Sequence, residues 1–210
     1  MVWPEVEQVS SNHRYELILS GDKINKRLED KNELDSTIWT LTQLNFLEIS
    51  SCSLLEHLSD DIGKLIHLST LTLTSNKLSE IPNQLKNLQN LRHLNLSYNQ
   101  LKTLPDDLFL NLNHLETLNL ANNLLEQLPN FSEKNDTLAI INLSHNQLQS
   151  LPDFPLLENL SQVDLSSNQF QVFPETLLHI NSLKMIVIDS NQLNEIPPGL
   201  SQLHKLKGLI

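Results

Sequence analysis

The chain has 210 residues, of which 39% are hydrophobic and only 5% aromatic, so its core must be built mainly from aliphatic side chains. With 14 basic and 25 acidic residues the formal net charge is −11, which disfavours a ligand held through a phosphate backbone, although a local basic patch is compatible with it. The single cysteine, Cys52, excludes an intramolecular disulfide. No segment approaches the ~20 apolar residues that cross a bilayer, and the first residues lack the pattern of a secretion signal. We therefore expect a cytoplasmic protein without a membrane segment.

Residues 1–43 do not follow the pattern of the rest of the chain, and we expect them to form a helical N-terminal cap. The first predicted helix buries Val6 and Val9 and has Gly21 as its natural stop. A second short helix is predicted for residues 22–31. Together the two helices would cover the open edge of the first structural unit behind them, as a stacked repeat protein requires.

One pattern then recurs through residues 44–205 at intervals of 22 to 24 residues. Its ideal form is L-x-x-L-x-L-x-x-N-x-L-x-x-L-P, and six of the seven copies come close to it. The pattern resembles that of intracellular leucine-rich repeat proteins, whose units stack into a solenoid. The resemblance implies a curved α/β solenoid with short parallel strands on the concave face and irregular or 3-10 segments on the convex face. The copies begin at Leu44, Leu68, Leu91, Leu115, Leu138, Leu160 and Leu183.

Each position of the repeat has an expected role. Positions one, four and six, such as Leu91, Leu94 and Leu96, should point inward and stack on adjacent coils. The Asn at position nine is polar yet lies where the chain turns inward, so its amide should satisfy backbone groups of its own and the neighbouring coil. Positions two, three, five, seven and eight should point out of the concave sheet. The predicted asparagine ladder consists of Asn76, Asn99, Asn123, Asn146, Asn168 and Asn191, with Cys52 as a small substitute in the first copy.

The segments that follow each Leu-Pro pair are expected on the convex side. Leu85 and Leu88 are three residues apart, which favours a short helical or 3-10 turn there. Residues 130–137, whose only apolar anchor is Phe131, and residues 154–157 lack such spacing. We predict irregular structure for these two convex segments.

The last residues, 206–210, open an eighth copy with Leu206 and Leu209 and stop before its Asn turn. An apolar solenoid edge without a cap invites association with other chains. We therefore expect these 210 residues to belong to a longer protein.

The predicted concave face is mostly Ser, Thr and Asn, which is also what a solvated surface without a function would carry. The exceptions gather on a few coils, with Arg92, His93 and Tyr98 on one of them. Aromatic and Arg side chains often anchor interfaces, and exposed apolar residues are unusual on a strand that should alternate. The residues predicted to bind a protein partner are Phe46, Arg92, His93, Asn95, Tyr98, Glu116, Asn119, Ile140, Asn142, His145 and Met185.

Catalytic and metal sites find little support in the sequence. Ser144 with His145, or His93 with Ser97, could be combined with Asp164 on paper, but all would lie on an open sheet without a pocket or an oxyanion donor. The eight histidines fall at different positions of the repeat, and four glycines leave no glycine-rich phosphate loop. We expect no enzyme activity, no cofactor and no metal site.

A second resemblance lies at the N-terminus, in Trp3-Pro4-Glu5, in residues 16–21 (ELILSG) and in residues 47–54 (LEISSCSL). Their order and approximate spacing are similar to the start of the leucine-rich repeat-containing protein 47 family of animals. That resemblance implies a longer protein, in which the repeats are followed by a module resembling the editing-type domain of the phenylalanyl-tRNA synthetase beta subunit. It also implies a general link with RNA binding and translation.

Three functions therefore stay open at this point. The first is a non-catalytic module of a larger cytosolic protein that holds a protein partner on its concave face. The second is an RNA-associated or translation-linked protein in which RNA is contacted through the full-length chain. The third is a regulatory scaffold for a phosphatase or a small GTPase, which differs from the first only in the identity of the partner.

Overall fold

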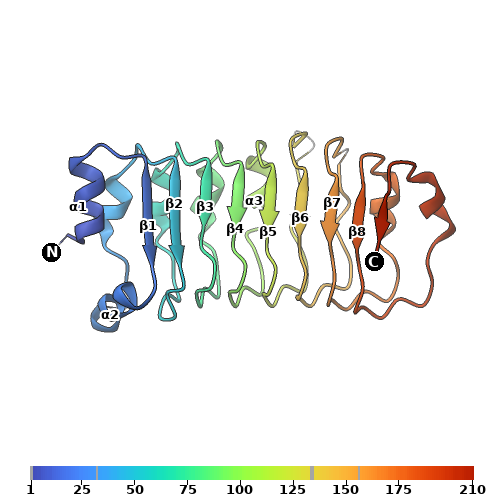
Figure 1. Ribbon diagram of the computed structural model, residues 1–210, viewed down its shortest axis with the longest axis horizontal. Helices are drawn as coiled ribbons and strands as arrows, with labels where there is room; N and C mark the ends of the chain where they lie inside the picture. The colour runs from blue at the N-terminus through green and yellow to red at the C-terminus, as the bar shows by residue number, and fades with distance from the viewer. Residues whose placement is uncertain (1, 32, 133–134, 156) are drawn as a thin grey trace.

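The computed structural model describes residues 2–31, 33–132, 135–155 and 157–210. Within them, nine strands form one open sheet in which neighbours follow the order of the chain and every pair is parallel (Figure 1). Parallel neighbours need a crossover, and each coil supplies it through the convex side. The predicted leucine-rich repeat solenoid is confirmed. The strands are β1 (Glu16–Ser20), β2 (Phe46–Ser50), β3 (Thr70–Thr72), β4 (His93–Asn95), β5 (Thr117–Asn119), β6 (Ile140–Asn142), β7 (Gln162–Asp164), β8 (Met185–Val187) and β9 (Gly208–Leu209).

The inward positions of the repeat build one continuous aliphatic core. Leu91, Leu94 and Leu96 are all buried, and Leu94 pairs in register with Leu118 of the next coil. Fully burying a Leu side chain contributes roughly 1.5–3 kcal/mol, and each coil buries several against its neighbours. The register of the sheet is therefore fixed by the leucine pattern, and the same repeat positions line up along the whole face.

A ladder of buried asparagines joins the coils beneath the sheet. The Oδ1 atom of Asn123 accepts a hydrogen bond from the backbone N–H of Leu101 at 3.1 Å. Its Nδ2 atom donates to the carbonyl oxygens of Leu96 in the preceding coil and Leu120 in its own, both at 3.0 Å. The same three bonds recur one coil after another, so the amides replace backbone pairing that the turn removes. The other members with this pattern are Asn76, Asn99, Asn146, Asn168 and Asn191.

Cys52 occupies the ladder position of the first repeat. Its N–H donates to Oδ1 of Asn76 at 2.9 Å, and its Sγ atom lies 3.3 Å from the carbonyl oxygen of Ser50. The side chain is fully buried, and this burial raises the pKa of the thiol to about 11. Cys52 therefore occupies the space of an asparagine side chain as a protonated thiol. It makes one weak hydrogen bond where the side chain of a ladder asparagine makes at least three.

The N-terminal cap contains two elements that were not predicted, the strand β1 between its helices and the 3-10 turn η1 (Ser36–Thr40) after them. Helix α1 (Pro4–Ser11) ends ten residues before Gly21, and the strand β1 lies between them. The segment Glu16–Ser20 alternates strictly between exposed and buried residues, which is the period of a strand rather than of a helix. Gly21 ends this strand with a φ of 70°, a conformation that glycine adopts without strain, and helix α2 (Asp22–Lys31) follows.

Charged groups hold the two helices of the cap together. Glu5 of α1 binds Lys23 at 2.6 Å and Arg27 at 2.7 Å, both from α2. The guanidinium of Arg27 also lies over the ring of Trp3, 5.1 Å from its centroid. Burial works against the ionisation of Glu5, but the hydrogen bonds from Arg27 and Lys23 outweigh it and lower the pKa of the carboxyl from 4.5 to about 2.

The convex side carries short helical turns where the leucine spacing predicted them. Phe131 lies in an irregular segment and stacks on Phe109 with ring centroids 4.4 Å apart, while Phe154 meets Phe131 edge to face at 5.3 Å. The rings of the two irregular segments thus pack in a row with Phe109, which lies in the helical turn α3 (Leu108–Asn111) of the preceding coil; residues 133–134 and 156 lie outside the described part. The helical turns are η1 (Ser36–Thr40), η2 (Asp60–Lys64), η3 (Asn83–Asn87), α3 (Leu108–Asn111), η4 (Glu175–His179) and η5 (Pro198–Gln202).

The eighth copy of the pattern begins as the others do. Strand β9 pairs with β8 in the register of the earlier coils, with Gly208 opposite Met185. A Cβ atom at Gly208 would lie 2.5 Å from Sδ of Met185, so the methionine side chain occupies the space above the glycine. Met185 is therefore half-buried on the concave face.

Candidate interaction surface

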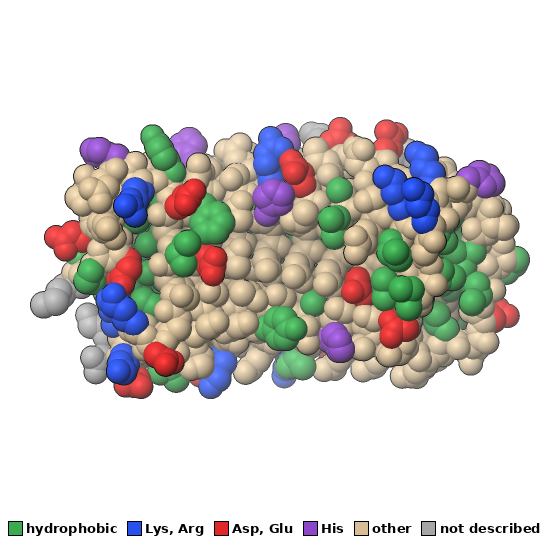
Figure 2. All heavy atoms as spheres, in the orientation of Figure 1, with side chains coloured by type: hydrophobic (Ala, Val, Ile, Leu, Met, Phe, Trp, Pro, Cys, Tyr) green, Lys and Arg blue, Asp and Glu red, His purple; other side chains and the backbone are tan. Residues whose placement is uncertain are grey.

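The concave face is the surface that the aligned strands present. Residues at positions three and five of each coil point out of it, and those at position four point into the core, as the exposures of β3 to β8 show. In the middle of this face uncharged polar side chains dominate, while charged and hydrophobic groups lie toward its margins and ends (Figure 2). Most of the predicted partner residues lie in three distinct environments on this surface, and three apolar ones lie apart from these.

The first environment is an ionic cluster at the margin where the strands begin. Arg92 and Glu116 occupy position two of adjacent coils and form a salt bridge. His93 lies beside them, with Nε2 4.0 Å from a carboxylate oxygen of Glu116 and Nδ1 2.9 Å from Oγ1 of Thr117. The Arg92 side chain keeps 53% of its accessible surface, so the pair leaves a guanidinium face open to a partner while its charge is compensated.

The second environment is formed by the asparagines at position five. Oδ1 of Asn95 accepts hydrogen bonds from the N–H and the Oγ of Ser97, at 3.0 and 2.7 Å. Asn142 and Ser144 repeat the arrangement, and Asn119 binds the N–H of residue 121 in the same way. Each of these amides therefore closes the turn after its strand in addition to lining the concave face.

Position seven is a correction to the sequence analysis, which placed it on the concave surface. Ser97 and Ser144 are 3% and 6% exposed, because each hydroxyl folds back onto the asparagine two residues before it. The next residue adopts a left-handed conformation, which redirects the chain into the core. The serine side chain is thereby enclosed by the turn.

The third environment is the row of left-handed turns at position eight, which contains Tyr98 and His145. Their φ values are 56° and 55°, and both side chains project from the margin where the strands end. Tyr98 keeps 58% of its surface exposed. Six positions separate it from Arg92, or about 15–20 Å at roughly 3.3 Å per residue, so these two residues of one coil lie on opposite margins of the face.

The apolar residues among the predicted partner contacts lie on different coils. Ile140 in β6 is 39% exposed, whereas Phe46 in β2 and Met185 in β8 are half-buried. Two further exposed residues, Tyr15 and Ile18, lie next to Phe46 and were missed by the sequence analysis, because it assigned no strand to residues 16–20. The signal that could have found them is the short apolar run of residues 17–19 between polar residues, which is compatible with a strand.

The serine and aspartate residues considered for catalysis are engaged in the turns of their own coils. Oγ of Ser144 and Oγ of Ser97 both bind the asparagine of their own coil, and Asp164 accepts from Ser166 at 2.7 Å in the equivalent turn. Over the described part of the chain, no group of three His, Cys, Asp or Glu residues is arranged to hold a metal ion. The described histidines His93 and His145 lie at different margins of the face and share no hydrogen bond.

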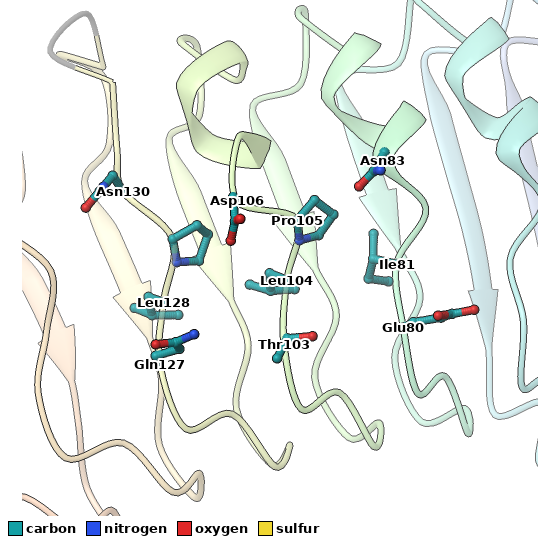
Figure 3. Close-up of a pocket in the computed structure, with 11 residues that line it drawn as sticks. Glu80, Ile81, Asn83, Thr103, Leu104, Pro105, Asp106, Gln127, Leu128 and Asn130 are labelled. Carbon is teal, nitrogen blue, oxygen red and sulfur yellow. The ribbon is translucent and has the colours of Figure 1, made fainter.

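A shallow groove lies away from the sheet, on the flank of three consecutive coils (Figure 3). Ile81, Leu104 and Leu128 are buried along its base, and polar side chains such as Glu80 and Gln127 stand exposed beside them. These residues occupy the same two repeat positions on each coil. The groove follows from the repeat itself, and its polar groups lie in parallel rows rather than converging on one point.

Comparison with known proteins places the chain in a family. A family model described as leucine rich repeat matches residues 42–101 and 89–148, which together cover just over half of the 210 residues. The chain belongs to the leucine-rich repeat family, whose members are in general interaction modules rather than enzymes. In the described residues, no helix is long and apolar enough to span a bilayer.

Individual relatives match only through their repeats. The protein flightless-1 homolog of Mus musculus is 49% identical over 53 residues, which are 25% of this chain and 4% of that protein. Leucine-rich repeat-containing G-protein coupled receptor 4 of Homo sapiens is 40% identical over 72 residues, 34% of this chain and 8% of the receptor. The chain thus matches less than a tenth of the length of these relatives.

A solved structure supports the fold across a larger part of the chain. The plant peptide hormone receptor RGFR1, determined in complex with RGF2, superposes with a TM-score of 0.74 at 24% sequence identity. The alignment covers 84% of this chain and 30% of the receptor chain. At this identity the similarity concerns the fold alone.

Proposed function

We propose that this chain is a protein-binding module that holds a protein partner on its concave face. The observation that carries the proposal is the presentation of Arg92, Tyr98 and His145 on a rigid frame. Arg92 is oriented by its salt bridge, and the two others project from fixed left-handed turns. A backbone that is already ordered loses little entropy on binding, and Arg and Tyr are among the residues most often found at the energetic centre of interfaces.

A photo-crosslinking experiment tests this proposal. A photoreactive amino acid is introduced in place of Asn95 on the concave face or of Leu110 on the convex helix α3, where the leucine is 45% exposed. Crosslinked protein adducts in cell extract are expected from position 95 and not from position 110. They should disappear when Arg92→Ala and Tyr98→Ala are combined, while the thermal unfolding of the double variant stays unchanged. Equal adducts from both positions would contradict a concave site.

A second candidate, an RNA-associated function, is favoured by one feature of the last two coils. Lys184, Lys205 and Lys207 are all exposed, and the backbone N–H of Lys207 donates to the carbonyl oxygen of Lys184 at 2.8 Å, which sets two of them side by side. Basic side chains gather over this end of the sheet, near β8 and β9 (Figure 2). Clustered lysines are the usual means of binding a phosphate backbone, and they stand out on a chain of net charge −11.

Salt dependence tests the RNA function. A fluorescent single-stranded oligouridine should bind at low ionic strength, lose affinity steeply as salt rises, and lose it further when the three lysines are replaced by Gln. Absence of binding at low salt would exclude a direct role for these residues.

The proposed cytoplasmic location is tested by imaging the tagged chain. The proposed editing-type domain of a longer protein is tested by reading the full-length coding sequence. A phosphatase or GTPase scaffold would use the same concave surface.

A further inference from the structure

The N-terminal end of the concave face carries a cluster of apolar and acidic side chains unlike the rest of the sheet. Tyr15 and Ile18 are 59% and 54% exposed, and the half-buried Phe46 lies in the adjacent strand. In the sheet register, Glu16 pairs with Phe46 and Ile18 pairs with Glu48, so apolar and acidic residues alternate across β1 and β2. We call these five residues the N-terminal patch. Figure 2 shows hydrophobic and acidic side chains lying side by side at this end of the face.

The position of Ile18 in the strand leaves its side chain exposed, where it adds nothing to the hydrophobic core. Leu17 and Leu19 on either side are buried against the cap, so Ile18 must point out of the sheet. The equivalent position on the next six coils is polar in every case, and only the last, Val187 in β8, is again apolar; the polar residues are Glu48, Thr72, Asn95, Asn119, Asn142 and Asp164. An isoleucine close to an exposed tyrosine and to Phe46 therefore forms an apolar patch next to the polar middle of this column, and exposed apolar patches of this kind mark contact sites.

The backbone of the patch is rigid. The carbonyl oxygen of Tyr15 accepts hydrogen bonds from the N–H groups of Asn45 and Phe46, at 2.9 and 3.1 Å, which ties the tyrosine to the neighbouring coil. The Oε1 atom of Glu48 accepts from Oγ of Ser50 at 2.7 Å, which directs its carboxylate along the strand. A ligand would thus meet groups that are ordered before binding, at a low entropic cost.

The charges of the patch define the chemistry of a ligand. Neither Glu16 nor Glu48 forms a salt bridge with a cation in the described part of the chain, and both carboxylates lie beside apolar surface. A cation, the exposed Arg14, precedes Tyr15 at the margin. With a net charge of −11 for the whole chain, a cationic ligand is attracted at long range as well.

We propose that the N-terminal patch binds a short peptide segment of a partner protein that carries a large apolar side chain next to a Lys or Arg. The apolar side chain packs between Tyr15, Ile18 and Phe46, and the cation contacts Glu16 and Glu48. The proposal rests on the proposed function in that both concern protein binding by the concave face. It adds a second contact region, four coils away from His145, and states what that region recognises.

Peptide selection tests the proposal directly. A phage-displayed library of random dodecapeptides is panned on the 210-residue chain, on the double variant Tyr15→Ser with Ile18→Ser, and on the control variant Val172→Ser, which removes a 70% exposed valine elsewhere. The original chain and the control should enrich peptides with Lys or Arg next to Leu, Ile, Phe or Trp, and the double variant should not. No enrichment, enrichment of acidic peptides, or equal enrichment on the double variant would overturn the proposal.

The best peptide, labelled with fluorescein, gives a second and quantitative readout by anisotropy. The double variant should bind at least about tenfold more weakly, as expected for loss of a central apolar contact. Glu16→Gln and Glu48→Gln should each weaken binding about two- to fivefold at low salt, whereas Arg14→Gln should strengthen it by about twofold. Unchanged affinity in both glutamine variants, or weaker binding by Arg14→Gln, would overturn the assignment of the cation.

The site around Arg92, Tyr98 and His145, here called the central site, and the N-terminal patch can be tested independently of each other. The variant with Arg92→Ala and Tyr98→Ala should keep its affinity for the peptide, because these residues lie on later coils. Loss of crosslinked partners with retained peptide binding would support both regions. Retained partners and retained peptide binding in this variant would contradict the central site alone, and failure of the peptide selection would leave the central site standing.

Discussion

Replacing Asn123 by Ala is the most direct test of how the coils are held together. Asn123 is 5% exposed, and its three shortest hydrogen bonds join the amide to backbone groups on two coils. The carbonyl oxygens of Leu96 and Leu120 keep a second donor after the change, because the asparagines of the coils before and after also bind them. The N–H of Leu101 has no such replacement and becomes a buried donor without an acceptor.

The expected cost follows from these three groups. An unsatisfied buried donor costs about 1–3 kcal/mol, and the loss of hydrogen bonds to carbonyls that keep one partner adds about 0.5–1 kcal/mol. The free energy of unfolding of Asn123→Ala should therefore fall by about 2–4 kcal/mol. Asn191 is the matched control, since it makes the same bonds but is half-buried, so water can replace the amide. Asn191→Ala should cost about 1 kcal/mol or less.

Urea unfolding followed by far-UV circular dichroism measures both changes, provided that each variant unfolds in a single transition. The slope of the free energy against urea concentration should stay the same, because the same surface is exposed on unfolding. If Asn123→Ala costs no more than Asn191→Ala, burial of the ladder is not what makes its amides stabilising, and the reasoning fails.

Three further predictions concern the cap, the thiol and the convex rings. Because the pKa of Glu5 is lowered from 4.5 to about 2 in the folded chain, its ion pairs stabilise the protein above pH 4.5, and this contribution is lost as the pH falls toward 2. Thermal melts of Glu5→Gln should show a weaker dependence on pH in that window and a loss of about 1 kcal/mol at neutral pH; identical pH profiles would contradict it. Cys52 should react with a thiol reagent at pH 8 only after unfolding, since it is buried and its pKa is raised to about 11, and rapid reaction of the folded chain would disprove this. Phe131→Ala should lower the free energy of unfolding by about 3–5 kcal/mol in the same urea assay, and a cost below about 1 kcal/mol would show that the stacked rings do not support the convex side.

The sequence predicts the repeated part of the fold well, because one residue type serves one role in every coil. Leucines at fixed positions specify the core, and the asparagine pattern specifies the turn. Strand β1 was missed because it lies 30 residues before its partner β2, outside the interval of the repeats, and because Gly21 rather than an asparagine follows it. Its sequence, ELILS, has three consecutive apolar residues, and so short an apolar run does not by itself distinguish a strand from a buried helical segment.

The surface was less predictable than the core, because it depends on the turn geometry and on neighbours 22 to 24 residues away. Asn95 and Asn142 were identified from their position, but their hydrogen bonds to the turn require the left-handed residue at position eight. Ser, Tyr, Asn and His occupy that position, and none of them signals a positive φ in the way that glycine does. The salt bridge between Arg92 and Glu116 also becomes visible only when adjacent coils are superposed.

The left-handed turns at position eight accept many different side chains. At this position the N–H of Tyr98 binds the carbonyl oxygen of Ala121, and the N–H of His145 binds that of Ser166, both at 2.9 Å. The residue at position eight thus contributes to the turn through its backbone, and its own side chain takes part in neither bond. Residues as different as serine and tyrosine can therefore be exchanged there while the path of the chain stays the same. Adjacent strands lie about 4.8 Å apart. The side chains along this row can therefore be exchanged, while the distances between their positions stay fixed.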